Sequence, residues 1–123
     1  MATDLEWMVL EGSADSHYGI GNPIWWNDGN RGSDVGKNLK STSGWQNNGN
    51  GTDLFGFTGL PGGIHHDDNT YIGKEKYGCF WTATRSASVF CSISRTLDYY
   101  YNMVYRDAPD RSDAQSVRCI KNY

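Results

Sequence analysis

Residues 79–84 read Cys-Phe-Trp-Thr-Ala-Thr, a short run of apolar, aromatic and β-branched residues that predicts a β-strand. Further strand-like segments follow at short spacing, at 88–97, 99–106 and 115–121, and another precedes this one at 71–73. Strands that follow one another with short connections favour antiparallel pairing. We therefore expect a small antiparallel sheet in the C-terminal half of the chain.

A first helix is expected near the N-terminus. Thr3 and Glu6 have the Ser/Thr-x-x-Glu spacing of a capping box. The helix is predicted from 4 to 11, because Gly12 is a natural stop. Its apolar residues fall largely on one helical face. They are Leu5, Met8 and Val9, with Trp7 and Leu10 beside them.

The region that follows predicts long, ordered loops. Residues 12–53 are rich in Gly, Asn, Asp and Ser, but three tryptophans interrupt them. A disordered linker rarely carries so many tryptophans, so these rings are expected to anchor the loops. Residues 34–40 predict a second short helix, although Gly36 lowers its stability.

The remaining segments complete an α+β pattern. Residues 54–60 predict an extended segment, and Pro61 followed by Gly62 suits the two central positions of a type II turn. The chain has 123 residues, the size of one domain, so residues 1–123 are expected to form a single one. Hydrophobic residues make up only 37% and aromatic residues 14%, which indicates a small, aromatic-rich core.

Charge and hydropathy exclude several classes of protein. The net charge is −3 without a run of basic residues, which argues against binding to nucleic acid. No apolar stretch approaches the roughly 20 residues that span a bilayer, so no membrane insertion is expected. The N-terminus, MATDLEWMVL, lacks the basic start and apolar run of a signal peptide. Either the native protein is not exported, or this chain lacks its leader.

The cysteines do not predict a disulfide framework or a zinc site. The chain contains Cys79, Cys91 and Cys119, and an odd number leaves at least one free thiol. Their spacing fits no zinc motif. We expect them to behave as small apolar residues, with one disulfide as the alternative.

Three short motifs suggest metal or sugar chemistry, but each has a simpler explanation. Residues 26–28 spell the Trp-Asn-Asp of calcium-dependent lectins, yet one Asn and one Asp do not make a calcium site. The two histidines and two aspartates at 65–68 fit a solvated hairpin loop, since no third ligand stands at a standard spacing. Residues 47–53 have oxygens enough for a weak calcium loop but fit a turn cluster better. No metal and no cofactor is expected.

The composition changes abruptly after Trp81. All 15 glycines lie before residue 82, whereas residues 82–114 contain no Gly, Lys, Glu, Gln or Trp, and their only Met is Met103. The same residues hold four arginines and four tyrosines. Tyr and Arg are favoured at binding surfaces, because they offer a stiff amphipathic ring and a planar fork of donors. The alternative is an exposed antiparallel sheet that is merely rich in tyrosine.

Five segments of the chain resemble, in family order, the bacterial family called the Fibrobacter succinogenes major paralogous domain. They are 3–7 (TDLEW), 36–45 (GKNLKSTSGW), 56–63 (GFTGLPGG), 80–84 (FWTAT) and 116–119 (SVRC). The resemblance implies a C-type-lectin-like fold in secreted or surface-displayed bacterial proteins. The sequence departs from the family where Arg85 replaces a usual acidic residue. A strand that usually precedes the first helix is also missing, so the domain is trimmed or a neighbour supplies that edge.

Some relatives look like the variable proteins of diversity-generating retroelements. Those systems randomise adenines in Asn codons of a C-terminal segment, and such codons cannot become Lys, Glu, Gln, Met or Trp. Residues 82–114 obey this restriction except at Met103. The resemblance therefore implies that 82–114 is a variable, ligand-binding segment on a fixed scaffold.

The implied function is non-enzymatic binding of a protein or glycan on a cell surface, by a domain located outside the cell or on a phage virion. Leu97, Val104 and Val117 are expected to face the core. The residues expected to contact the ligand are Arg85, Ser94, Thr96, Asp98, Tyr100, Tyr101, Tyr105, Asp107, Ala108, Pro109, Asp110, Arg111 and Asp113. The sequence does not indicate the oligomeric state.

Two other functions remain as alternatives. One is a structural or fixed-specificity module of a bacterial surface or phage virion protein. The other is an enzyme related to the formylglycine-generating enzymes, which share the lectin-like fold and depend on active-site cysteines. The three cysteines here do not match that motif, and no Ser/His/Asp set, paired carboxylates or phosphate loop is present. We therefore expect no catalytic residues.

Overall fold

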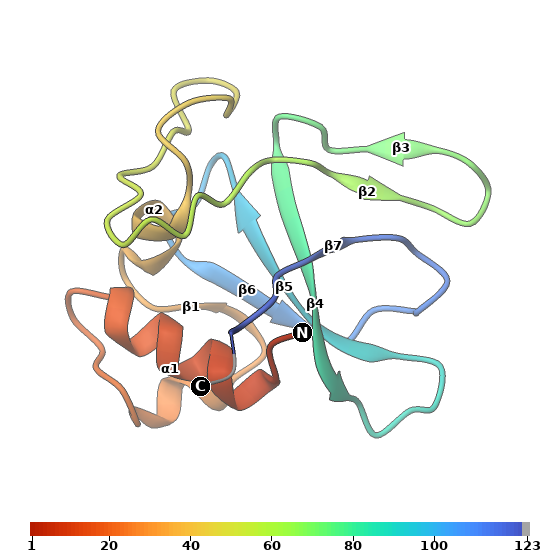
Figure 1. Ribbon diagram of the computed structural model, residues 1–123, viewed down its shortest axis with the longest axis horizontal. Coiled ribbons are helices and arrows are strands. Elements are labelled where there is room, and N and C mark those ends of the chain that lie inside the picture. Colours follow the sequence, from red (N-terminus) through yellow and green to blue (C-terminus); the bar gives the residue numbers. More distant parts are fainter. Residues whose placement is uncertain (122–123) are drawn as a thin grey trace.

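A five-stranded sheet forms the centre of the structure, a computed structural model that describes residues 1–121 (Figure 1). Its strand order is β1-β6-β5-β4-β7, and β2 and β3 form a separate hairpin. The helices precede nearly all of the strands, which confirms the α+β class. The elements are α1 (Asp4–Ala14), the 3₁₀ helix η1 (Pro23–Trp26), β1 (Gly29–Arg31), α2 (Val35–Leu39), β2 (Ile64–His65), β3 (Tyr71–Ile72), β4 (Tyr77–Arg85), β5 (Ser92–Asp98), β6 (Val104–Asp107) and β7 (Ser116–Val117).

The sheet is mixed, so the prediction of a purely antiparallel sheet is wrong at β7. This strand pairs with β4 in parallel, because the chain crosses over after β6 and then runs in the direction of β4. The same edge of β4 is covered by two more short pieces. Gly63 bridges to Gly78, and the carbonyl of Ala2 accepts a hydrogen bond from the N–H of Ala83. The edge of β4 is therefore closed along most of its length.

Helix α1 begins as predicted but ends three residues later. The side chain of Thr3 accepts a hydrogen bond from the N–H of Glu6, and the Glu6 carboxylate accepts one from the N–H of Thr3, so the capping box is present. The helix continues through Gly12 to Ala14. A Cβ at Gly12 would lie 2.6 Å from the Cα of Ile20, so this glycine permits close packing and does not end the helix.

The predicted apolar face of α1 is wrong for two of its three residues. Leu5 and Val9 are 59% and 51% exposed, and only Met8 is buried. Two acidic residues, Asp4 and Glu11, face the interior instead. They do so because arginines from the sheet neutralise them, and a hydrophobicity pattern contains no sign of such partners.

The second predicted helix is present as α2, and its cap comes from a distant residue. The carboxylate of Asp15 accepts hydrogen bonds from the N–H groups of Ser33, Asp34 and Val35. It also accepts hydrogen bonds from the N–H groups of His17 and Tyr18. Burial raises the pKa of Asp15, but these hydrogen bonds to the charged form outweigh it and the pKa is lowered.

The segment between α2 and the hairpin differs from the prediction. Residues 54–60 form turns and contain no strand, with one isolated bridge at Gly59. The type II turn is also wrong, because the positive φ (73°) falls on Gly63 and not on Gly62. A Cβ at Gly63 would lie 2.3 Å from the carbonyl oxygen of Ile72, so the glycine is needed where the hairpin strands meet.

The three C-terminal strands were predicted correctly, but each is shorter in the structure than in the prediction. The predicted strand at 88–97 begins only at Ser92, the one at 99–106 begins at Val104, and the one at 115–121 is reduced to β7. Leu97 and Val104 are fully buried, which confirms them as core residues. Val117 is 54% exposed and was wrongly assigned to the core, because β7 is an edge strand whose Val117 stands opposite Trp81.

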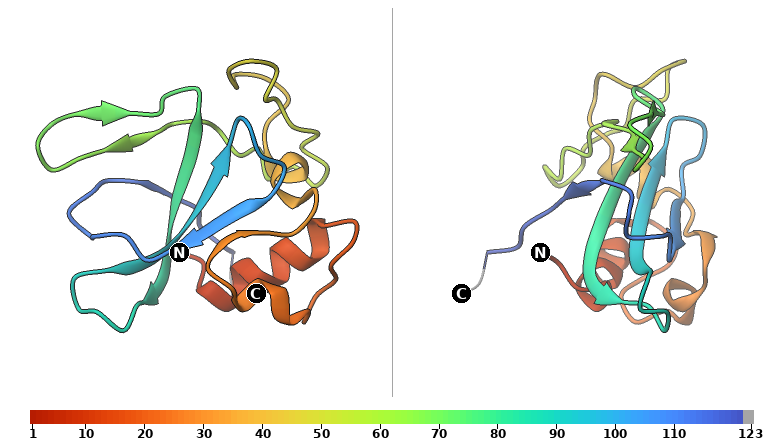
Figure 2. Two further views of the ribbon diagram at one scale, coloured as in Figure 1. Left: turned by 180° about the vertical axis from the view of Figure 1, so that it is seen from behind. Right: turned by 90° about the vertical axis from the view of Figure 1, so that its right-hand side faces the viewer.

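An aromatic cluster forms the centre of the core. Trp7 of α1, Phe57 of the loop and Phe80 of β4 lie with ring centroids 5.5 to 5.7 Å apart in tilted and edge-on contacts. Each such ring buries a large area, so a few of them can form the centre of a small core. Seen from behind and from the side, the β2–β3 hairpin and α1 lie at opposite ends of the molecule (Figure 2).

Candidate functional site

Arg95 and Arg106, two of the four arginines in residues 82–114, are bound to carboxylates and are not available to a ligand. Arg95 of β5 donates from Nε to Glu11 over 2.6 Å, and Arg31 of β1 donates from Nη2 to the same carboxylate over 2.9 Å. All three side chains are at most 1% exposed. This network packs β5 and β1 against α1.

The network continues towards the surface through Asp4. Its carboxylate lies 2.7 Å from Nη2 of Arg95 and 2.8 Å from Nη2 of Arg106. Arg106 also bonds to Asp28 over 2.6 Å. Burial raises the pKa of Asp4, but the hydrogen bonds and charges of the two arginines outweigh burial and lower it. The Trp-Asn-Asp motif thus supplies Asp28 to an ion pair.

The opposite face of the sheet holds part of the predicted binding site. Thr96 and Asp98 of β5 stand beside Tyr105 of β6, since cross-strand neighbours share a face. Tyr101, from the turn between these strands, completes one side of a cavity of about 330 Å³. The hairpin covers the other side. The cavity is lined by Asn30, Ile64, Ile72, Tyr77, Cys79, Thr96, Asp98, Tyr101 and Tyr105.

The turn at 99–103 presents the most exposed of the predicted binding residues that are tyrosines. Tyr100 is 74% exposed, and its ring lies 5.1 Å from that of Tyr101 in an edge-on contact. Beneath the turn, buried Lys40 donates from Nζ to the carbonyls of Asp98 (2.9 Å) and Tyr101 (3.4 Å). Burial lowers the pKa of Lys40. The N–H groups of Gly36 and Lys37 both bond to the carbonyl of Asn102.

The remaining predicted residues do not join this cavity. Tyr100 borders a polar hollow of about 510 Å³ with residues 47–50. Arg85 and Arg111 line a third depression of about 340 Å³. Asp107 ends β6, residues 108–110 begin the connection that follows it, and none of these four residues lines any of the three spaces.

Ser94 is wrongly assigned to the binding face. It points to the same side as Thr96 but is only 3% exposed. Its cross-strand neighbours are Trp81 on β4 and Asp107 on β6, whose larger side chains flank it.

Asp113 holds the hairpin in place. Its carboxylate lies 2.8 Å from Nδ1 of His66, and the backbones of His65 and Ala114 exchange two hydrogen bonds. The pKa of His66 is raised, first by the hydrogen bond to Asp113. These contacts hold the hairpin in the position where Ile64 and Ile72 line the cavity.

Several lining residues were missed by the sequence argument. Tyr77 and Cys79 line the cavity from β4, and with Trp81 they alternate along the strand on the same face as Thr96, a period that the sequence contains. Ile64 and Ile72 reach the cavity only because the hairpin folds over, and nothing in the sequence indicates that contact.

The cysteines and the metal-like motifs have ordinary surroundings. All three cysteines are free, and burial raises the pKa of Cys79 to about 11. Within the described residues 1–121, no three His, Cys, Asp or Glu side chains are grouped to hold a metal ion. The Asp53 carboxylate closes its own loop by bonding to Thr58. In the same part of the chain, no helix is long and apolar enough to cross a membrane.

One comparison with known proteins gives a match. A family model described as the Fibrobacter succinogenes major domain matches residues 1–121. No curated protein and no solved structure matches the chain.

Proposed function

Because the chain belongs to the Fibrobacter succinogenes major domain family, we propose that it is a non-enzymatic ligand-binding domain with a C-type-lectin-like fold. Its ligand is a protein or glycan on a cell surface. The domain acts outside the cell, in a bacterial surface protein or a phage virion. The contacts are made by side chains of residues 85–113.

The observation that carries this proposal is the group of tyrosines around the cavity on the outer sheet face. Tyr100, Tyr101 and Tyr105 are 74%, 41% and 40% exposed, and two of them line the cavity. Tyrosine gives a large contact area at a small loss of side-chain entropy, which suits a recognition surface. A cavity of about 330 Å³ falls in the size range of ligand pockets.

In β5 and β6, the inward residues hold the fold and the outward residues are free to change, which supports diversification by a retroelement. Their inward residues belong to the core or to the charge network, as Leu97 and Arg95 do. Outward residues such as Thr96 and Tyr105 can change without opening the core. Met103, the one residue outside the reachable codon set, is half-buried and directly precedes the fully buried Val104. Such a position suits a fixed residue.

Sequencing the encoding locus tests the retroelement. A reverse-transcriptase gene beside a near-copy of codons 82–122, differing only at adenines, is the expected result. Finding no such copy would leave a ligand-binding domain of fixed specificity.

A display library tests the binding face without knowledge of the natural ligand. Thr96, Tyr100, Tyr101 and Tyr105 are randomised together, and the library is selected against streptavidin. We expect most members to fold and some to bind. A control library of equal size randomises Leu5, Val9, Ile20 and Trp26 near α1. Loss of folding in the first library, or binders from the control alone, would overturn the proposed face.

One observation favours the alternative of a structural module. Leu5, Val9, Ile20 and Trp26 form an apolar surface on the α1 side, each more than half exposed. Sedimentation equilibrium of the wild type and of a Leu5→Ser, Val9→Ser variant separates the two functions. Self-association that this variant abolishes would support the structural module, and a monomeric wild type would weigh against it.

A further inference from the structure

Four of the six arginines are engaged within the described residues 1–121. Arg31, Arg95 and Arg106 bond to carboxylates, and the guanidinium of Arg118 lies 4.7 Å from the centroid of the Phe57 ring. The other two, Arg85 and Arg111, have neither an ion pair nor a ring contact in this part of the chain. Both are exposed and both line the same depression.

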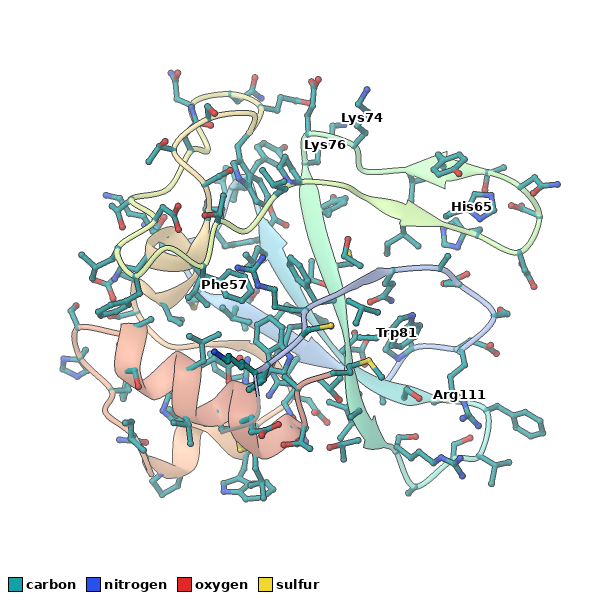
Figure 3. All side chains as sticks on the ribbon, in the orientation of Figure 1. Phe57, His65, Lys74, Lys76, Trp81 and Arg111 are labelled. Atoms are coloured by element: carbon teal, nitrogen blue, oxygen red, sulfur yellow. The ribbon has the colours of Figure 1, made fainter. Side chains whose placement is uncertain are left out.

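This depression lies beside β4, at the end of the strand away from the hairpin. Its volume is about 340 Å³, and no acidic side chain lines it among residues 1–121. Trp81 and Arg111 lie on the same side of β4 (Figure 3). The lining consists of Met1, Trp81, Thr82, Ala83, Arg85, Ser92, Arg111 and Val117.

The acidic group closest to these arginines in sequence is Asp110. Its carboxylate accepts a hydrogen bond from the N–H of Ser112 over 2.8 Å, and this bond is the main reason that its pKa is lowered. The positive charge of Arg111 lowers the pKa of Asp110 to a smaller extent, but the two side chains do not form an ion pair among the described residues. Asp110 does not line the depression. The two guanidiniums thus retain unused donors in a space bordered by an indole ring.

We propose that this depression binds the carboxylate of an acidic sugar, and this proposal rests on the proposed ligand-binding function. Guanidinium forks match the planar carboxylate, and charge-assisted hydrogen bonds are the stronger kind. The half-buried indole of Trp81 packs against the C–H face of the sugar ring, and the hydroxyl of Ser92 takes a sugar hydroxyl.

The closed strand edge favours a sugar over an acidic peptide. An extended peptide gains much of its affinity by pairing with a free strand edge. Here β7 pairs with Phe80 and Trp81, and Ala2 bonds to Ala83, so that edge of β4 is already closed along most of its length. A compact ring with one carboxylate needs only the side chains that line the depression.

Titration of the full chain with D-glucuronic acid, followed by NMR, tests the proposal. We expect saturable shifts of the Trp81 indole N–H and of the Nε–H signals of Arg85 and Arg111, and no such shifts with glucose. The Arg85→Gln, Arg111→Gln variant should bind at least about tenfold more weakly, because both charge-assisted contacts are lost.

A matched variant removes two positive charges elsewhere. Lys74→Gln, Lys76→Gln changes two exposed lysines beyond the opposite end of β4, and the nine-residue strand spans roughly 25–30 Å. Glucuronate should bind this variant as it binds the wild type. Equal weakening in both variants would overturn the proposal, since net charge alone would then explain the binding.

Two further results would overturn the sugar site. One is the absence of glucuronate binding, and the other is equally tight binding of sulfate or of a Glu-containing peptide. Neither bears on the tyrosine face, because the display library does not change Arg85 or Arg111. A library without binders, together with specific glucuronate binding, would reject the tyrosine face and retain the sugar site.

Discussion

The carboxylate of Glu11 on α1 lies 2.6 Å from Nε of Arg95 on β5, and both side chains are fully buried. Replacing Glu11 by Gln should lower the free energy of unfolding by about 3–5 kcal/mol, because Arg95 and Arg31 would lose a buried countercharge. Urea unfolding measures this loss.

Asp28→Asn is the control for the Glu11 variant. Asp28 belongs to the same network, but its side chain is 78% exposed, so water compensates for its loss. A similar loss of stability in both variants would contradict the structural role given to burial.

The three exposed tyrosines should not support the fold. The Tyr100→Ala, Tyr101→Ala, Tyr105→Ala variant should unfold within a few degrees of the wild type, while Leu97→Ala should lose about 2–5 kcal/mol. Thermal unfolding by circular dichroism compares them. A drop for the triple variant as large as that for Leu97→Ala would remove these tyrosines from the binding face.

The lowered pKa of Asp15 predicts that the fold becomes less stable at acid pH. Its pKa is lowered from the usual 3.8 in the folded state, so the unfolded chain takes up the proton first as the pH falls. Its contribution is complete above about pH 5 and is lost as the pH falls through the folded pKa. Urea midpoints between pH 2 and 7 should decline less steeply for Asp15→Asn, and an unchanged decline would exclude this carboxylate as a cause.

The His66–Asp113 pair predicts an effect at higher pH. The pKa of His66 is raised above 6.5 mainly by its hydrogen bond to Asp113. Its stabilising contribution is therefore present below pH 6.5 and is lost as the pH rises through the folded pKa. In an NMR titration, Asp113→Asn should return the His66 pKa towards 6.5, whereas Asp67→Asn should change it little. Equal effects would show that the contact is not specific.

The helices and strands were predicted well from the sequence where a short segment by itself determines the structure. The capping box at Thr3 and the alternation of Leu97 with Thr96 are such cases. Strand β1 was missed, because Gly-Asn-Arg carries no strand signal; in the structure it pairs with β6, and its Arg31 forms the buried ion pair with Glu11.

The candidate site was predicted less completely, because it depends on neighbours that are distant in sequence. The alternation places Ser94 on the outward face, but its neighbours Trp81 and Asp107 bury it. Arginine content indicated a binding surface, yet Arg95 and Arg106 point inward to carboxylates of the N-terminal quarter. No local pattern separates them from Arg85 and Arg111.

Lys40, Gly36 and Lys37 hold the turn at 99–103 by its carbonyl oxygens. Every residue type has the same backbone carbonyl, so these hydrogen bonds do not depend on which side chains the turn carries. The side chains of the turn could therefore change repeatedly in evolution while the turn kept the same backbone conformation. Under the proposed diversification, the ability to acquire new ligands would depend on the residues that hold the backbone of the turn and not on those that change.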